Sequence, residues 1–142
     1  MTSAAMNRAQ VTDWVAAYEH AWRAPGTGAL GGIFTPDATY WQGPYEEPVV
    51  GLPAIGGMWE TERDGPSEVF RMTSDVIAVD GDTAVVRVEV SYGDPVHQEY
   101  RDLWVLRFAA DGRCAWFEEW PFWPDQPDHA TWPDRPPCEG TG

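Results

Sequence analysis

Two long segments rich in aromatic residues constrain this chain most: Gln98–Phe108 and Arg113–Trp123, joined by the short turn Ala109-Ala110-Asp111-Gly112. An Asp-Gly pair between two such segments predicts a β-hairpin, because the turn needs a positive φ that glycine adopts at little cost. Side chains alternate between the two faces of a strand, and both arms carry aromatic or large apolar residues. The hairpin therefore needs cover on both faces, which predicts a sheet wrapped around helices on its concave side.

Periodicity and chain breakers predict the remaining elements. Apolar residues recur at helical spacing from Val11 to Trp22, with Thr12 or Asp13 as the candidate N-cap. We expect a short helix over Gly28–Phe34 and a third helix after Gly51. The expected strands before the hairpin are Asp37–Gln42, Tyr45–Val50, Glu68–Val79 and Thr83–Tyr92. Helices followed by a run of strands indicate an α+β fold.

The 142 residues are enough for one domain with a hydrophobic core. We expect a flexible N-terminus over residues 1–10, a folded domain over residues 11–123, and an extended Pro-rich C-terminal tail over residues 124–142.

The charge balance argues against two classes of partner. The formal net charge is −14 and the pI is about 4.3, so nucleic acid and anionic membranes would be repelled. No stretch of about 18 apolar residues and no signal-peptide pattern is present. The sequence therefore predicts a cytoplasmic protein with Cys114 and Cys138 as free thiols.

Three stretches resemble one known superfamily: Phe34-Thr35-Pro36-Asp37-Ala38-Thr39-Tyr40, Gly51-Leu52-Pro53-Ala54-Ile55, and Asp111-Gly112-Arg113 followed by Trp120. In this order they resemble the nuclear transport factor 2-like superfamily, and within it the SnoaL-like and limonene epoxide hydrolase-like branch. The resemblance implies a cone: a strongly curved antiparallel sheet closed by three helices, with a pocket inside its mouth. Because this fold serves isomerases, dehydratases, cyclases, epoxide hydrolases and non-catalytic binders, it does not define a function by itself.

The resemblance places ketosteroid isomerase's three catalytic positions at Gln42, Trp14 and Trp104. That enzyme needs a carboxylate base and two acidic hydrogen-bond donors. An amide cannot take up a proton at neutral pH and an indole only donates, so this chemistry is disfavoured.

Limonene-type epoxide hydrolase matches better, at Tyr40 and Gln42, Arg87 and Glu89, and Glu119. The resemblance implies that Tyr40 and Gln42 position a water or a substrate oxygen. It likewise implies Glu89 as base, Arg87 as the group that orients it, and Glu119 or Asp102 as acid. Three of these positions carry one methylene more than that family, and displacements of this size can change a rate about 100-fold.

Several of these residues have two readings on the sequence alone. Arg87 and Glu89 alternate with Val86, Val88 and Val90, and this pattern alone favours a solvated ion pair with the valines inside. The resemblance favours the pocket instead. Adjacent residues of a strand point to opposite faces, so one of the pair Glu118-Glu119 must face the concave side. If Phe117 is inside, then Glu119 is inside too.

Asp102 shares a face with Tyr100 and Trp104. It is either a second buried acid near Arg87 or an exposed partner of Arg101 or Arg107. His97 and Glu99 share a face without a third ligand at a recognisable spacing, so no metal is predicted.

The sequence thus predicts an acid–base enzyme that needs no cofactor and acts on a small hydrophobic metabolite. The alternative is a non-catalytic ligand-binding or dimerisation module of the same fold. We expect a homodimer, because Trp116 and Trp120 would otherwise expose a large apolar surface. The expected substrate-binding side chains are aromatic: Trp14, Tyr18, Trp59, Tyr100, Trp104 and Phe117.

Overall fold

The computed structural model describes residues 5–63 and 68–125. Three helices and six strands are formed by these residues: α1 (Arg8–Arg23), α2 (Leu30–Ile33), β1 (Phe34–Trp41), β2 (Val49–Val50), α3 (Leu52–Glu62), β3 (Phe70–Asp80), β4 (Thr83–Tyr92), β5 (Gln98–Phe108) and β6 (Cys114–Phe122). The predicted α+β class and the predicted order of elements are confirmed.

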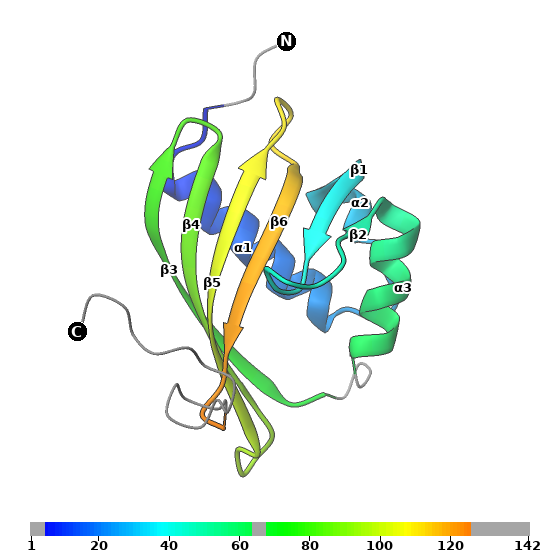
Figure 1. Ribbon diagram of the computed structural model, residues 1–142, viewed down its shortest axis with the longest axis vertical. Helices are drawn as coiled ribbons and strands as arrows, with labels where there is room; N and C mark the ends of the chain where they lie inside the picture. The colour runs from blue at the N-terminus through cyan, green and yellow to red at the C-terminus, as the bar shows by residue number, and fades with distance from the viewer. Residues whose placement is uncertain (1–4, 64–67, 126–142) are drawn as a thin grey trace, which may run out of the picture.

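The strands form one curved sheet in the order β2-β1-β6-β5-β4-β3, with the helices gathered against one of its faces (Figure 1). Neighbouring strands are antiparallel except β1 and β6, which run parallel. The parallel pair follows from the topology, because the last strand of the chain returns beside the first one. The prediction of an antiparallel sheet is therefore correct except for the parallel pair β1 and β6.

The central hairpin forms as predicted, with β5 paired antiparallel to β6 and a register shift at Arg107/Phe108. Gly112 has a φ of 86° in the turn, which is the left-handed conformation that the Asp-Gly signal indicates. β4 and β5 have the predicted bounds, whereas β6 begins at Cys114 and ends at Phe122.

The N-terminal helix begins earlier than predicted. Asn7 Oδ1 accepts a hydrogen bond from the backbone N–H of Gln10, and Gln10 Oε1 accepts one from the N–H of Asn7. This capping box satisfies two orphan donors at the helix start, so α1 begins at Arg8 and not after Thr12 or Asp13. The expectation of a flexible segment up to residue 10 is wrong for residues 8–10, which are helical.

The core lies between α1 and the concave face of the sheet. The buried stripe of α1 consists of Val11, Trp14, Val15, Tyr18 and Ala21. The Trp14 ring meets Phe34 and Phe108 edge-on, with centroids 5.6 and 5.7 Å away. Trp14 Nε1 donates a hydrogen bond of 2.9 Å to the Ile33 carbonyl, so the buried indole has a partner.

Cys114 is a buried free thiol, as predicted. Burial raises the pKa of Cys114 to about 12, which keeps the thiol protonated and unreactive at neutral pH. Cys138 and most of the predicted tail lie outside the described residues. No helix among residues 5–63 and 68–125 is both long and apolar enough to cross a membrane.

The packing around Trp14 makes a prediction for stability. Phe108 is 2% exposed and lies away from the pocket, whereas Tyr45 is 99% exposed. We expect Phe108→Ala to lower the free energy of unfolding by about 3–5 kcal/mol, because it leaves a cavity in the core. Tyr45→Ala should change it by no more than about 0.5 kcal/mol. Urea unfolding of both variants measures the difference, and equal effects would contradict this packing.

Candidate active site

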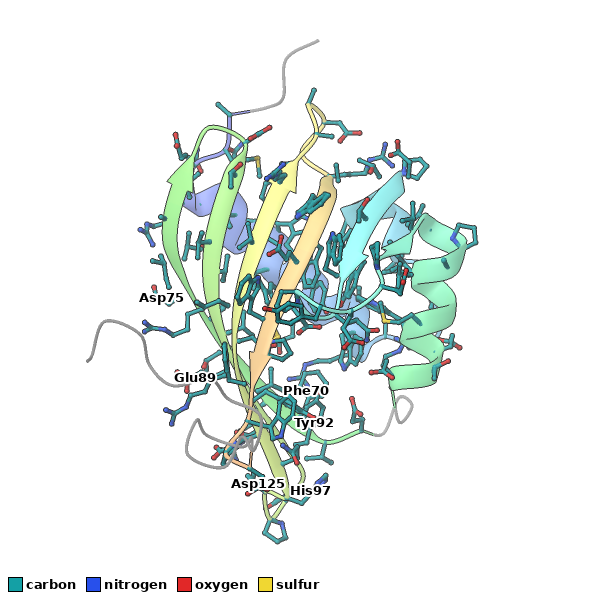
Figure 2. All side chains as sticks on the ribbon, in the orientation of Figure 1. Phe70, Asp75, Glu89, Tyr92, His97 and Asp125 are labelled. Atoms are coloured by element: carbon teal, nitrogen blue, oxygen red, sulfur yellow. The ribbon has the colours of Figure 1, made fainter. Side chains whose placement is uncertain are left out.

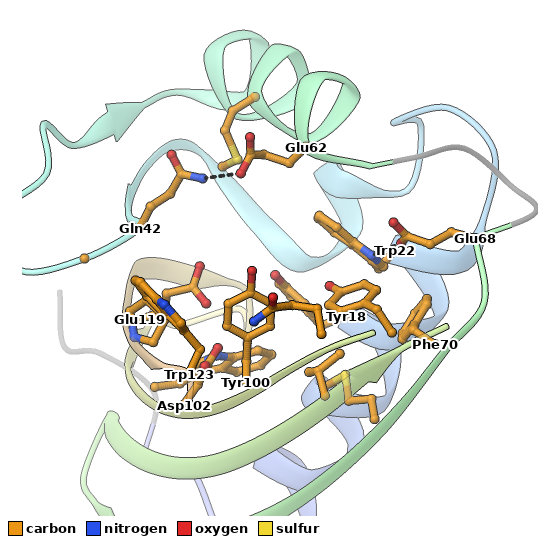
Figure 3. A pocket seen from close by; sticks show the side chains of 18 of the residues that line it. Tyr18, Trp22, Gln42, Glu62, Glu68, Phe70, Tyr100, Asp102, Glu119 and Trp123 are labelled. Carbon is orange, nitrogen blue, oxygen red and sulfur yellow. Dashed lines mark hydrogen bonds between the residues drawn. The ribbon is translucent and has the colours of Figure 1, made fainter. Parts of the chain in front are cut away.

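A pocket of about 1040 Å³ opens between the sheet, α1 and α3 (Figure 3). Its inner wall comes from the concave face of β5 and β6, where Asp102, Trp104 and Glu119 lie. Tyr18 and Trp22 of α1, Tyr40 of β1 and Phe70 of β3 add aromatic surface. The pocket exists because the apolar side chains of the core cover only part of the concave face of the sheet.

The chemically distinctive feature is a pair of carboxyl groups on neighbouring strands. Asp102 is 7% exposed, and Glu119 is partly exposed toward the pocket that it lines. Trp104 pairs with Glu119 across the β5–β6 ladder, which places Asp102 one step diagonally from Glu119 on the same face. The two carboxyls are close enough to shift each other's pKa.

The environment gives these two carboxyls different proton affinities. The pKa of Glu119 is raised well above its usual value, first by burial, then by the adjacent Asp102 and finally by Glu62. Burial also raises the pKa of Asp102, but the nearby Glu119, Trp104 indole and Phe122 backbone oppose that rise. Like charges at this distance do not both ionise readily. The pKa of both carboxyls is therefore raised, and at Asp102 the neighbouring groups oppose part of the rise.

One oxygen of that carboxylate lacks a good partner. Asp102 Oδ1 is buried without a well-formed hydrogen bond, and so is Trp104 Nε1, although the indole lies close enough to lower the pKa of Asp102. A buried oxygen without a partner is destabilising by about 1–3 kcal/mol.

Two tyrosine hydroxyls lie beside the carboxyl pair. Tyr18 Oη and Tyr40 Oη are hydrogen-bonded at 2.8 Å, and both rings stack on Phe117. Burial raises the pKa of both tyrosines well above 10, and the charge of Glu119 adds to the rise. Both hydroxyls therefore stay protonated at neutral pH. One of them donates to the other, which leaves one O–H that can donate to a substrate oxygen.

The opposite wall carries a second polar contact. Gln42 Nε2 donates a long hydrogen bond of 3.4 Å to Glu62 Oε1, at the C-terminal end of α3 (Figure 3). Gln42 thus lines the pocket, as predicted, but its amide is directed to Glu62.

Most of the predicted catalytic residues meet in this pocket. Tyr40, Gln42, Asp102 and Glu119 all line it, and their roles remain predictions. The inference that Glu119 is inside whenever Phe117 is inside is confirmed, because Phe117 is fully buried. Glu118 points to the other face and accepts hydrogen bonds from the indoles of Trp116 and Trp120.

The placement of Arg87 and Glu89 in the pocket was wrong. Both side chains are exposed on β4, and neither lines the pocket. Glu89 is labelled in Figure 2. Val86 and Val88 are fully buried on the opposite face. The plain alternation of valines and charges decided the orientation of this strand, and the valines face α1. Asp102 is therefore a buried acid without Arg87 as its partner.

The predicted substrate-binding residues divide into two groups. Tyr18, Tyr100 and Trp104 line the pocket. Trp14, Trp59 and Phe117 do not line it and belong to the buried core, so their predicted contact with substrate is corrected. Their rings support the wall from behind: Trp59, for example, lies 5.1 Å from Tyr18 between ring centroids.

Sequence reasoning missed Glu62 and Trp22. Trp22 extends the buried stripe of α1 by one turn beyond Tyr18, and Glu62 follows Ile55 and Trp59 at helical spacing on α3. A carboxylate that continues an apolar stripe at the end of a helix is the signal that could have identified Glu62.

The fold and pocket define a cone-shaped protein of the nuclear transport factor 2-like superfamily. A family model for the SnoaL-like domain matches residues 14–117, and the chain belongs to that family. Comparison with curated proteins gives no match.

Three solved structures share the fold. A ketosteroid isomerase-like protein from Erwinia carotovora atroseptica is 21% identical with a TM-score of 0.59, covering 84% of this chain and all of its own. SalBIII, an epoxide hydrolase/cyclase-like enzyme of pyran ring formation in salinomycin, is 15% identical with a TM-score of 0.65, over 84% of this chain and 95% of its own. A Methylobium petroleophilum protein of unknown function with a cystatin-like fold is 16% identical with a TM-score of 0.64, over 88% and 82%. At these identities the likeness shows the fold alone.

The raised pKa of Glu119 predicts how stability depends on pH. A carboxyl whose pKa is higher in the folded state stabilises the fold at low pH, and this contribution is lost as the pH rises from about 4.5 through the folded-state pKa. We expect Glu119→Gln to make the decline in unfolding free energy from pH 5 to pH 8 shallower, by at most about 1.4 kcal/mol per pH unit.

Glu99 offers the matched control, because it is an exposed carboxylate on the same strand as Asp102 but outside the pocket. Glu99→Gln should show the same pH dependence of the unfolding free energy as the wild type. Urea unfolding at several pH values measures both, and a Glu119→Gln profile with the wild-type slope would contradict the burial of this carboxyl.

Proposed function

We propose that this protein is a cofactor-independent acid–base enzyme that acts on a small, largely hydrophobic metabolite, with Glu119 as general acid and Asp102 as general base. The observation that carries the proposal is the pair of neighbouring carboxyls on the pocket wall, both with a raised pKa. Two adjacent carboxyls whose environments separate their pKa values are the arrangement that supports proton donation and proton removal in one site.

The proposed cycle balances in protons. Glu119 gives its proton to a substrate oxygen as a C–O bond breaks, or as a carbonyl becomes an enol. Asp102 takes a proton from a substrate carbon, from a water, or from an internal hydroxyl that forms the new C–O bond. The proton then passes from Asp102 back to Glu119, which restores the starting state. Hydrolysis, dehydration, isomerisation and cyclisation all fit this sequence.

Tyr18 and Tyr40 supply the neutral donors of the proposed site. Their hydroxyls lie near Glu119 and remain protonated, so they can bind the substrate oxygen that receives the proton. A preorganised donor of this kind contributes about 2.7–4 kcal/mol of transition-state stabilisation where its loss has been measured in enzymes. The rings of Trp104 and Phe70 provide apolar surface for the rest of the substrate.

The test uses neutral hydrophobic epoxides and β,γ-unsaturated ketones, with product formation followed by gas chromatography and solvent deuterium incorporation. We expect Asp102→Asn and Glu119→Gln each to lower kcat/KM by about 10²–10⁴-fold, because each removes one proton-transfer group. Glu89→Gln is the matched control: it is a carboxylate outside the pocket, and its turnover should equal that of the wild type.

If Asp102→Asn and Glu119→Gln both turned over at the wild-type rate, the mechanism would be excluded. If the folded wild type bound the compounds without turning any of them over, the non-catalytic binding module would be favoured instead.

We also propose that two copies of the chain associate through the outer face of β5 and β6. Leu103 and Trp120 are paired across this ladder and are 39% and 40% exposed, which leaves adjacent apolar surface uncovered. Exposed apolar patches of this kind commonly mark an interface.

Light scattering after size exclusion tests this association. The wild type should elute with twice the chain mass of 15.9 kDa, and the double variant Leu103→Glu and Trp120→Glu should elute at that mass, because two buried like charges oppose association. Tyr45→Glu, which adds charge at an exposed site elsewhere, should stay dimeric. A monomeric wild type would exclude the dimer.

A further inference from the structure

The pocket wall carries charge of one sign. Six acidic residues line it: Glu46, Glu62, Glu68, Asp94, Asp102 and Glu119. Among the described residues that line it there is neither a lysine nor an arginine, and His97 at the exposed rim is the one side chain there that can become cationic. A cleft lined by one sign of charge concentrates ligands of the opposite sign.

Two arginines lie close to the pocket without lining it. The guanidinium of Arg23 packs over the Phe70 ring and pairs with Glu19 at 2.9 Å. Arg63 pairs with Glu60 and donates to the carbonyls of Ala24 and Gly26. Because each guanidinium already has its own carboxylate, neither offsets the charge of the pocket wall.

Glu62 lies apart from the carboxyl pair, on the helical wall of the pocket. It is the last residue of α3, where the negative end of the helix dipole disfavours a carboxylate. Its side chain accepts a long hydrogen bond of 3.4 Å from the neutral Gln42 amide. Its charge also contributes to the raised pKa of Glu119 across the pocket. A cation bound at Glu62 would relieve all three effects.

Two further features complement a cation. The rings of Trp22, Tyr92 and Tyr100 line the same pocket, and aromatic faces attract ammonium groups. In addition to its charge, the pocket-lining residue Asp102 has a buried oxygen, Oδ1, without a hydrogen-bond partner, which indicates that a hydrogen-bond donor is missing from this site.

We propose that the substrate is a hydrophobic amine, and that Glu62 binds its ammonium group on the wall opposite Asp102 and Glu119. Figure 3 shows Glu62 on the α3 side of the pocket and the carboxyl pair on the sheet side. The inference rests on the proposed function in that the carboxyl pair acts on the remainder of the same molecule. Anionic metabolites, such as carboxylates and phosphate esters, are excluded by the same field.

The experiment compares three probes that share one apolar body: biphenyl-4-methylamine, biphenyl-4-methanol and biphenyl-4-carboxylate. Their Kd values for the full chain are measured by isothermal titration calorimetry at pH 7 and low salt. We expect the amine to bind about tenfold more tightly than the alcohol and the carboxylate to bind most weakly. The preference for the amine should shrink in high salt, where exposed charges are screened.

Glu62→Gln should bring the amine to the affinity of the alcohol, with the alcohol changed less than twofold. Glu99→Gln removes the same charge from the surface outside the pocket, and it should keep the wild-type preference.

The proposal is overturned if the wild type binds the alcohol as tightly as the amine, if it binds no amine at millimolar concentration, or if folded Glu62→Gln keeps the full preference. Should Glu62→Gln fail to fold, the comparison of the three probes on the wild type decides. Loss of the amine preference leaves the acid–base proposal standing, because that proposal is tested on neutral substrates with Asp102→Asn and Glu119→Gln.

Discussion

The structure depends on the packing of one helix into a curved sheet. α1 presents Trp14 and Tyr18 to the concave face, where the rings of Phe34, Phe108 and Phe117 surround them. Aromatic side chains bury large areas with few rotatable bonds, so a cluster of this kind stabilises strongly for the number of residues it uses. The sheet must curve to close over these rings, and its curvature creates the hollow.

The pocket lies at the point where the aromatic filling gives way to polar side chains. Along β5 the inward positions change from Phe108, Leu106 and Trp104 to Asp102, and along β6 they change from Phe117 to Glu119. Placing two carboxyls against rings opposes stability, because burial disfavours their charged forms. A local conflict of this kind within a consistent fold is expected at functional sites. It also gives the two acids their different proton affinities.

The acidic side chains of the pocket wall indicate which kind of ligand binds, in addition to which kind of reaction is catalysed. Catalysis by a carboxyl pair places no demand on Glu62, which lies on a different element and across the hollow. Its position at a helix C-terminus, beside a neutral amide, is locally unfavourable. A bound cation accounts for that position, whereas an apolar ligand leaves it unexplained.

Strand alternation and turn chemistry allowed Glu119 and the hairpin to be predicted, because a two-residue period fixes which side chains share a face. Tyr40 and the inward placement of Asp102 were predicted from the family resemblance. The same rule correctly favoured the inward valines of β4, and the family resemblance misassigned Arg87 and Glu89 because it outweighed that pattern. Trp14, Trp59 and Phe117 could not be separated from pocket residues, since core and pocket draw on the same aromatic side chains. Glu62 was missed because its role depends on how α3 packs against the sheet.

The amino-acid sequence by itself determined the α+β order of elements, the hairpin and the inward face of each strand, because these follow from local periodicity and turn chemistry. Only the tertiary structure decided which inward residues fill the core and which face a hollow. It also decided that Asp102 and Glu119 become neighbours, since strand register and the packing of α1 and α3 are properties of the assembled sheet.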